Sequence, residues 1–422
     1  MSVNLRVLLE EMIEREASDL HLTAGERPKL RVDGDITNAN SCADIMNPKD
    51  TLSLAYSVLT ENQKKRFETE DELDFSFGIQ NLARFRGNVY KQRGCVSVAI
   101  RMIPFNVRTF NELGLPPVVA KLAERPRGLI LVTGPTGSGK STTLAAIIDK
   151  INKERKGHII TVEDPIEFIH RHQSCIVNQR EVGTDTKSFA SALKYCLRED
   201  PDVILVGEMR DLETVAAALT IAETGHLALA TLHTNSAAES INRIIDVFPS
   251  SQQSQVRAQL AFVLEGVLTQ TLLPRSRGRG RVMATEIMVV TPAIRALIRD
   301  DKVHQIQSSM QAGQKFGMQT MNSSLYQLYM NREVAQEECL RVSPDPNEFL
   351  RMIGEKPLED QEIGTAPSGK VASSSGGAAN QEKDRCRSSS IPHATRRRAR
   401  SRRDSSTSLP RTTSPRISGR TG

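Results

Sequence analysis

The glycine-rich stretch at residues 134–141, GPTGSGKS, constrains this chain more than any other feature of its sequence. It matches the Walker A pattern, follows directly on the apolar run 128–133 and leads into residues 141–148, whose composition predicts a helix. A strand, a tight glycine turn and a helix in this order aim several backbone N–H groups, and the positive end of a helix dipole, at one phosphate chain. The stretch therefore predicts an α/β domain that binds a nucleoside triphosphate, as in a triphosphatase or a kinase.

Two side chains of the predicted loop have specific chemistry toward the nucleotide. Lys140 would reach the β- and γ-phosphates, and the hydroxyl of Ser141 would ligate Mg²⁺. We expect ATP to be held by nine consecutive residues, Gly134, Pro135, Thr136, Gly137, Ser138, Gly139, Lys140, Ser141 and Thr142.

Length and composition set limits on the rest of the chain. Its 422 residues allow two or three domains with ample core. The sequence has no apolar run near the roughly 18–20 residues that a membrane span needs, and no apolar signal-peptide segment at its N-terminus. We therefore expect a cytoplasmic protein. The six cysteines are scattered without a C-x-x-C pair, which argues against a zinc knuckle or a disulfide framework.

The net charge of +6 is unevenly distributed. Residues 370–422 hold 13 Lys and Arg against 3 Asp and Glu, a balance of +10, which leaves about −4 for the first 369 residues. The body of the chain therefore gives no electrostatic sign of nucleic-acid binding. Residues 356–422, rich in Ser, Gly, Arg and Thr, are predicted to be a disordered tail. This tail could be an RNA- or membrane-binding arm, or an extension without function.

The pattern of apolar residues predicts two domains. Residues 1–102 are expected to form a small α+β domain with half-buried antiparallel strands, and 103–117 a linker. Residues 118–355 are expected to form the nucleotide-binding domain, with 251–355 mostly helical and a helical C-terminal part from about 274.

Between residues 118 and 250, strand-like runs alternate with helix-like segments, which predicts a parallel sheet covered by helices. The predicted strands are 128–133, 158–162, 175–178, 203–206 and 227–232, and the predicted helices lie near 139–153, 187–198, 211–223 and 237–247. Nucleotide sites in such sheets lie beyond the carboxyl ends of the strands, so residues that follow each strand are candidates for the site.

Two of these strand ends supply carboxylates. Glu163 follows strand 158–162, and Glu208 comes just after strand 203–206, in a Walker B-like position. Hydrolysis needs an acid that orients or deprotonates water, and Mg²⁺ held opposite Lys140. We expect Glu208 to hold Mg²⁺ through water and Glu163 to polarise the attacking water, although the two roles could be exchanged. Either residue alone could also be a helix cap or a solvated loop acid.

A third strand, 227–232, ends at His233, which is placed to hydrogen-bond the γ-phosphate. His226, which precedes the same strand, is the weaker candidate, and each histidine has a purely structural alternative. In the first domain, Arg84 and Arg86 flank Phe85, and Arg101 follows another strand. Arginine suits phosphate recognition, but composition alone favours a solvated sheet face for all three.

Together these motifs resemble the secretion and type IV pilus ATPase (GspE) superfamily, and above all its twitching-motility retraction ATPases of the PilT/PilU type. The resemblance covers about residues 1–350. The motifs that carry it are the Walker A loop 134–142, the aspartate box 160–168 (ITVEDPIEF), the Walker B stretch 200–211 (DPDVILVGEMRD) and the histidine box 223–235.

The resemblance implies a homohexameric ring in which a PAS-like N-terminal domain precedes a RecA-like motor domain, with ATP bound between them. It implies that Arg86 and Arg101 reach the phosphates, with Arg84 as the runner-up, so that the catalytic set is Glu163, Glu208, His233, Arg86 and Arg101. It also implies a motor at the cytoplasmic face of the inner membrane, near the pilus base. The motor would associate with the membrane peripherally, by binding an inner-membrane platform protein. A paralogous retraction ATPase is a further candidate partner. No nucleic acid is expected as a partner.

Two observations favour retraction over assembly within the superfamily. The chain lacks the tetracysteine zinc module usual in assembly and secretion ATPases, and residues 293–299 resemble the "AIR" helix of retraction motors. That helix is equally an amphipathic packing helix, and residues 317–325 resemble the family's C-terminal signature. The alternatives are an assembly or type II secretion ATPase, a RecA-like nucleic-acid motor and, more distantly, a small-molecule phosphotransferase.

Overall fold

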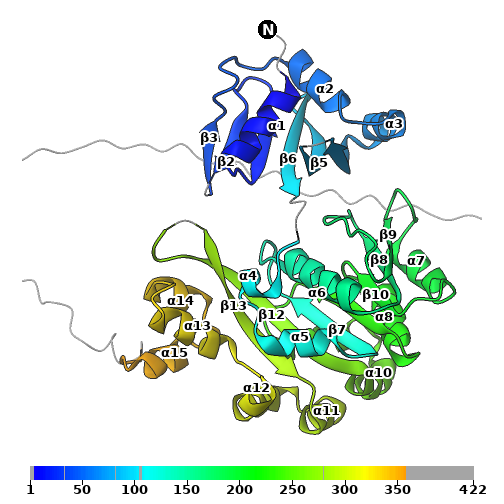
Figure 1. The fold of residues 1–422 in the computed structure, drawn as a ribbon, viewed down its shortest axis with the longest axis vertical. Helices are drawn as coiled ribbons and strands as arrows, with labels where there is room; N and C mark the ends of the chain where they lie inside the picture. Colours follow the sequence, from blue (N-terminus) through cyan, green and yellow to red (C-terminus); the bar gives the residue numbers. More distant parts are fainter. Residues whose placement is uncertain (1–3, 33, 81, 104–106, 279, 358–422) are drawn as a thin grey trace, which may run out of the picture. The chain divides into compact units, whose positions relative to one another are not determined.

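The computed structural model describes residues 4–32, 34–80, 82–103, 107–278 and 280–357. These residues form two separate β-sheets, each with its own helices (Figure 1). The predicted disordered tail, 356–422, lies outside the described residues except for its first two positions.

The N-terminal sheet is antiparallel and has the strand order β3-β2-β1-β6-β5-β4. Its strands are β1 (Asp19–Leu22), β2 (Lys29–Val32), β3 (Asp35–Asn38), β4 (Glu72–Ile79), β5 (Ala83–Gln92) and β6 (Cys95–Ile103). Burial alternates along β5, where Phe85, Gly87 and Val89 are buried and the intervening Arg86 and Asn88 are half-buried. This is the period of a sheet with one face on the core, and it confirms the predicted α+β character.

Three helices accompany this sheet, α1 (Leu5–Glu14), α2 (Pro48–Tyr56) and α3 (Glu61–Glu70). Only the first of them was expected from the sequence. The other two each begin with a capping box, in which Asn47 pairs with Asp50 and Thr60 pairs with Gln63. Such a pair satisfies two orphan N–H groups at once and is visible in a sequence, so it was an available signal for both helices.

The second sheet has the order β13-β12-β7-β11-β10-β8-β9 and is parallel except for β13. Its first five strands in the chain match the predicted ones closely, and they are β7 (Gly128–Thr133), β8 (His158–Glu163), β9 (Ile176–Glu181), β10 (Val203–Val206) and β11 (Leu227–Leu232). All residues of β7, β10 and β11 are buried, as expected for strands covered by helices on both faces.

Alternate residues of β7 face opposite layers. Leu129 and Leu131 belong to a buried cluster with residues of six helices, and Ile130 and Val132 belong to a buried cluster with residues of two others. The first layer contains α7 (Phe189–Cys196), α8 (Leu212–Glu223), α9 (Ala237–Asp246) and α10 (Ser250–Val263), and the second contains α5 (Pro117–Ala123) and α6 (Lys140–Glu154). Together with the sheet they form the three-layered α/β architecture that the alternation predicted.

The expected linker, 103–117, is partly helical. It contains the short helix α4 (Phe110–Leu113) and the first residue of α5, and residues 104–106 lie outside the described part of the chain.

The prediction that residues 251–355 are mostly helical missed a β-hairpin. Helix α10 is followed by a hairpin of two long strands, β12 (Leu264–Pro274) and β13 (Arg281–Val289), so the helical C-terminal part begins at α11 (Pro292–Arg299) and not near 274. β12 pairs in parallel with β7, and most of its side chains are buried. Residues 266–270 are buried on both faces of the strand, so the segment has no regular period-2 alternation that would distinguish it from a buried helix. The remaining helices are α12 (Ile306–Ala312), α13 (Met321–Met330), α14 (Gln336–Val342) and α15 (Pro346–Ile353).

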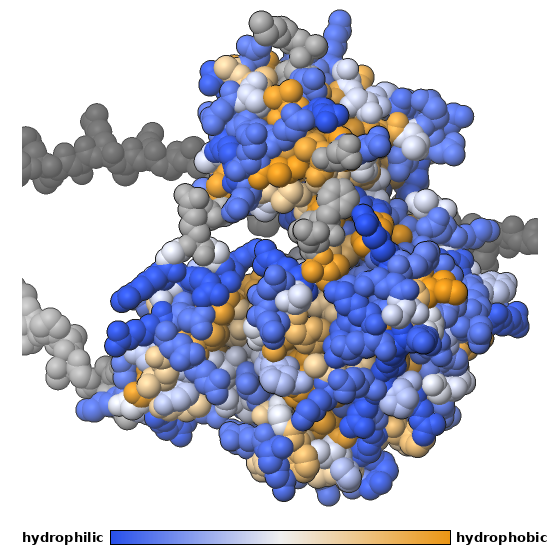
Figure 2. Space-filling view, viewed as in Figure 1, coloured by the Kyte–Doolittle hydropathy of each residue, from blue (hydrophilic) through white to orange (hydrophobic). Residues whose placement is uncertain are grey.

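The surface carries few large apolar side chains, and the face drawn in Figure 2 is largely hydrophilic with small apolar patches. In the part of the chain that the structure covers, none of the helices has the length and apolar character needed to cross a bilayer.

Helix α11, which resembles the AIR helix, is fastened to the core. Thr291 caps it, and Ile294 and Ile298 are fully buried. The guanidinium of Arg295 donates to the carbonyls of Ala261 and Phe262, at 2.6 Å each, and to the Glu265 carboxylate at 2.6 Å. Those carbonyls belong to the last turn of α10, which has no intrahelical donors for them. Arg295 therefore caps the C-terminus of α10 and anchors α11 to it.

Arg295→Ala is expected to lower the free energy of unfolding by about 2 kcal/mol, because two helix-end carbonyls and a half-buried carboxylate lose their donor. Urea denaturation followed by circular dichroism would measure the change. Arg299→Ala is the matched control, since Arg299 is exposed and pairs only with the neighbouring Asp300. Equal midpoints for the two variants would show that the Arg295 contacts add nothing to stability.

Candidate nucleotide site

The loop between β7 and α6 is shaped by three glycines. Gly134, Gly137 and Gly139 have φ angles of +138°, +80° and +89°, where a side chain would be strained. A Cβ atom on Gly134 would also lie 2.7 Å from the Ser138 hydroxyl. The chain can therefore turn sharply enough to start α6 at Lys140, with the backbone N–H groups of its first turn open at the end of the sheet.

Strand register brings the predicted site residues to one edge of the sheet. The last residue of β7, Thr133, pairs with Leu232 at the end of β11 and with Thr269 on β12. His233 and Glu208 follow the neighbouring strands β11 and β10, and Glu163 ends β8, the next strand along. The glycine loop, the histidine and the two acids thus line the same carboxyl edge, in that order.

Lys140 is folded back onto its own loop. Its ammonium donates to the carbonyls of Gly134 at 2.8 Å and Pro135 at 3.1 Å, and lies 3.4 Å from Nδ1 of His233. Burial lowers the pKa of Lys140, while the negative charges of Glu208 and Glu167 oppose that shift. Its partners are mostly neutral carbonyls, so an incoming phosphate would offer this cation a stronger partner than it has.

His233 joins Lys140 to Glu208. Its Nε2 lies 3.1 Å from a carboxylate oxygen of Glu208, while Nδ1 faces the lysine. These two contacts suit the neutral ring protonated on Nε2, which donates to the acid and accepts from the ammonium.

Glu208 is held from a second side by Arg210, whose Nε and Nη2 donate to its two oxygens at 2.5 and 2.7 Å. Burial works to raise the pKa of Glu208, but the bonds and charge of Arg210, with His233, leave it below its usual value. The group is therefore an anion at neutral pH. That charge is what holding a divalent cation requires.

Glu163 has a different environment from Glu208. The Thr161 hydroxyl donates to its carboxylate at 2.6 Å and the Gln179 amide at 3.2 Å, and no cation is paired with it. Burial raises its pKa, and these two hydrogen bonds counter only part of the effect. A carboxylate whose pKa is raised by burial is a better proton acceptor than an ordinary one. Two acids on neighbouring strands thus have pKa values shifted in opposite directions.

The structure separates the two histidine candidates. His226 precedes β11, at the amino end of the sheet, where its carbonyl accepts from Gly128 and its ring contacts Thr224. Six strand residues lie between it and His233, a span of about 20 Å. His226 therefore lies outside the cluster formed by the glycine loop and the acids.

The three arginines lie on one face of the N-terminal sheet. Arg84 and Arg86 alternate with the buried Phe85, as predicted, and Arg86 is directly opposite Arg101 in the β5–β6 register. Arg84 donates to the Ser76 hydroxyl at 2.9 Å, and Arg101 donates to Asp19 at 2.8 Å but remains 64% exposed. Like charges directly opposite each other destabilise an antiparallel pair unless an anion compensates them.

Sequence reasoning missed Gln270, a fully buried residue of β12. Its amide donates to the carbonyl of Ser138 at 2.7 Å, so β12 supports the glycine loop through this hydrogen bond. The Ser138 hydroxyl and the other amide atom of Gln270 are buried without a hydrogen-bond partner. Gln270 stands among other polar residues of 264–273, so its role could be recognised only once the segment was known to be a strand beside β7.

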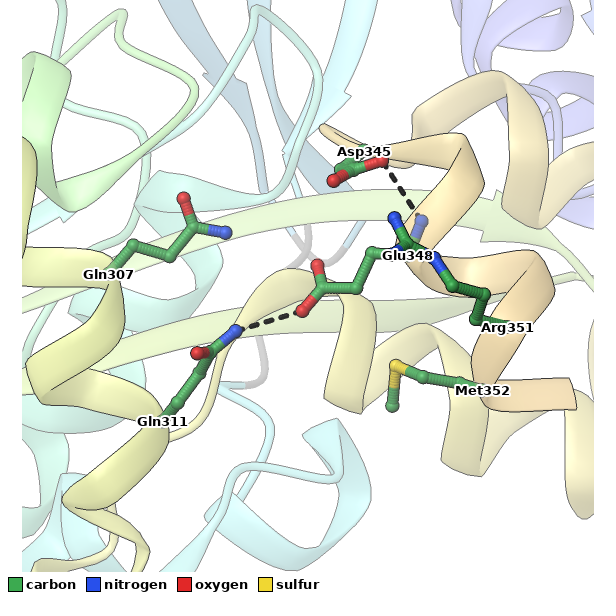
Figure 3. A pocket seen from close by; sticks show the side chains of 6 residues that line it. All are labelled: Gln307, Gln311, Asp345, Glu348, Arg351 and Met352. Carbon is green, nitrogen blue, oxygen red and sulfur yellow. Dashed lines mark hydrogen bonds between the residues drawn. The ribbon is translucent and has the colours of Figure 1, made fainter. Parts of the chain in front are cut away.

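A pocket lies between α12 and α15, away from the glycine loop. Its lining residues are Gln307, Gln311, Asp345, Glu348, Arg351 and Met352 (Figure 3). Its polar groups bond to one another, since Gln311 donates to the Glu348 carboxylate at 2.8 Å and the Glu348 N–H donates to Asp345 at 2.9 Å. It contains no glycine loop, so it lacks the features of a phosphate site.

The fold and the edge cluster define a P-loop ATPase with a RecA-like sheet. The family described as Type II/IV secretion system protein matches residues 2–341, and the chain belongs to this family.

Two relatives come from Pseudomonas aeruginosa. The type IV pilus retraction ATPase PilT is 48% identical over 347 residues, which span 82% of this chain and 100% of that protein. The type IV pilus ATPase PilU is 42% identical over 346 residues, spanning 82% of this chain and 90% of PilU. A crystal structure of the pilus retraction motor PilT with bound ADP shares 51% identity and a TM-score of 0.77, covering 83% of this chain and 99% of that one.

Gln270→Ala is expected to weaken nucleotide binding by roughly tenfold, because the Ser138 carbonyl loses its buried donor and the loop is no longer held in shape. Titration with a fluorescent ADP analogue would measure the dissociation constant. Gln319→Ala removes a comparable amide bond, 2.9 Å to the Thr285 carbonyl on the same hairpin, and should leave binding unchanged. Parent-like affinity in Gln270→Ala would reduce Gln270 to a packing residue.

Proposed function

We propose that this chain is a hexameric motor ATPase that hydrolyses ATP to drive type IV pilus retraction and twitching motility. The observation that carries the proposal is the similarity to the retraction ATPase PilT, which extends over that protein's whole length. The site independently supports the ATPase part of the proposal. Lys140, His233 and Glu208 form one hydrogen-bonded chain next to the glycine loop, which places a cation and a carboxylate where phosphoryl transfer uses them.

In the proposed reaction, the backbone N–H groups of residues 137–141 cradle the phosphates, and Lys140 exchanges its carbonyl partners for phosphate oxygens. His233, already between the lysine and the acid, senses the γ-phosphate. Glu163, with its raised pKa, is the better supported base for the attacking water, and Glu208, with its lowered pKa, is the better supported anion near the metal. These contrasting environments favour the first of the two assignments left open by the sequence.

The chain's donor set suits Mg²⁺. Among the described residues there is no cluster of three or more His, Cys, Asp or Glu side chains that could hold a metal ion by itself. Mg²⁺ is commonly held by one or two protein oxygens, the nucleotide phosphates and water, which agrees with Ser141 in the first turn of α6 and Glu208 through a water. When bound, the ion would neutralise charge that develops on the β- and γ-phosphates.

Arg86 and Arg101 are proposed to complete the site by contacting the phosphates, with Arg84 as the runner-up. Arg86 and Arg101 lie directly opposite each other on neighbouring strands, so both can contact one anion, and a phosphate would compete with their present partners, Asp74 at 3.9 Å from Arg86 and Asp19 at 2.8 Å from Arg101. The proposal includes the division of the chain into two domains, residues 1–102 and 118–355, joined by a linker at 103–117. In the proposed ring, hydrolysis changes the angle between these two domains.

The proposed partners are five further copies of the chain and an inner-membrane platform protein at the pilus base, reached from the cytoplasmic face. A paralogous retraction ATPase is a further candidate partner. PilU is itself a relative at 42% identity, so an accessory retraction ATPase is the nearest alternative function. An assembly ATPase of the same family is the next.

Deletion of the gene, with complementation by the parent or by Lys140→Ala, tests this function. We expect deletion cells that do not twitch yet carry abundant surface pili, rescue by the parent and no rescue by Lys140→Ala, because the phosphates lose their fixed positive partner. Twitching assays and counts of surface pili by electron microscopy give the readout. Cells without pili would indicate an assembly ATPase, and rescue by Lys140→Ala would refute the site assignment.

A further inference from the structure

Glu286, on β13, is a buried carboxylate that the ATPase chemistry above does not use. It is 8% exposed, and one of its oxygens accepts from the backbone N–H of Ala237 at 2.8 Å. The backbone N–H of Met321 donates to the same carboxylate. Ala237 is the first residue of α9 and Met321 the first of α13, so one side chain binds the N-termini of two helices.

The two helix N-termini offset part of the cost of burying this carboxylate. Burial raises the pKa of Glu286, and the two backbone hydrogen bonds work against that rise. The N-terminus of a helix carries unpaired N–H groups and a partial positive charge, so two of them facing one carboxylate favour its ionised form. Replacing the carboxylate with an amide would keep the shape but place an NH₂ group against an N–H donor.

Glu286 lies in register with the nucleotide edge. It pairs with Thr269 on β12, which pairs with Thr133 on β7, which in turn pairs with Leu232 on β11. The hydroxyls of Thr133 and Thr269 are also hydrogen-bonded, at 2.8 Å. His233 is the next residue after Leu232, and only the short segment 234–236 separates it from the start of α9. Because Glu286 fixes the N-terminus of α9, it also fixes the C-terminal end of the segment 233–236, which begins at His233.

The second helix held by Glu286 belongs to the segment 317–325, which the sequence analysis singled out. Gln319 and Ile287 exchange two backbone hydrogen bonds, at 2.8 and 3.0 Å, directly beside Glu286. The Ser324 hydroxyl accepts from the N–H of Thr285 at 3.0 Å. The segment is thus docked along β13, with Glu286 as its link to the histidine segment.

We propose that Glu286 is a positioning residue: by tying α9 to α13 it holds His233 in place to read the γ-phosphate, and it makes that reading depend on the docked 317–325 segment. This inference rests on the proposed role of His233. It assigns a function to the buried acid and to the signature segment that goes beyond packing.

The test measures the preference for a triphosphate over a diphosphate, as the ratio of the dissociation constants for ADP and for a non-hydrolysable ATP analogue with Mg²⁺. We expect Glu286→Gln to lower this ratio by about tenfold while ADP affinity stays near that of the parent, because only the γ-phosphate contact is displaced. Glu286→Asp keeps the carboxylate but moves it away from the two helix N-termini, because the side chain is shorter. It should also lower the ratio, and it provides the test if the amide variant does not fold.

A double variant separates positioning from general destabilisation. If Glu286 acts through His233, then Glu286→Gln should change the ratio no further in a His233→Ala background. Arg295→Ala, which loosens α11 outside the 317–325 segment, should lower stability without changing the ratio. An unchanged ratio in Glu286→Gln and Glu286→Asp, or the same fall in Arg295→Ala, would overturn the inference. An unchanged ratio in His233→Ala would instead refute the proposed role of the histidine, with the ATPase assignment still resting on Lys140.

Discussion

The parallel pairing of β7 with β11 and β12 is the interaction on which the rest of the motor domain depends. It aligns Thr133 with Leu232 and Thr269, so that the residues following each strand emerge at one edge. A shift of one residue would turn every side chain of a strand to the other layer, and the two helical layers packed on β7 leave no room for that. The burial that stabilises the sheet therefore also sets the positions of Lys140, His233 and Glu208.

The two carboxylates at that edge of the sheet differ in their surroundings. Glu208 is paired with Arg210 and His233, and its pKa is lowered, whereas Glu163 has only neutral donors and its pKa is raised by burial. Opposite shifts in two neighbouring acids divide the tasks of holding a cation and accepting a proton. Their local order in the sequence is the same, since each acid follows an apolar strand. Their neighbours tell them apart: Arg210 and Thr161 are each two residues away from the acid they contact, whereas His233 and Gln179 come from other segments.

The sequence was sufficient for features that are local. The glycine loop and five strands of the sheet each have a signal within a few residues, and each was found where it was predicted. The hairpin of β12 and β13 was missed because stretches of both strands are buried on both faces and show no alternation, and the roles of Gln270 and Glu286 were missed with it. Those roles come from partners 132 and 49 positions away along the chain, contacts that no periodicity records.

A crystal structure of the chain with Mg²⁺ and a non-hydrolysable ATP analogue would test the central claim most directly. The account predicts phosphates within hydrogen-bonding distance of the N–H groups of residues 137–141, the Lys140 ammonium moved from the Gly134 and Pro135 carbonyls to phosphate oxygens, and His233 beside the γ-phosphate. Nucleotide bound elsewhere, or bound at the loop while Lys140 keeps both carbonyl partners, would contradict it.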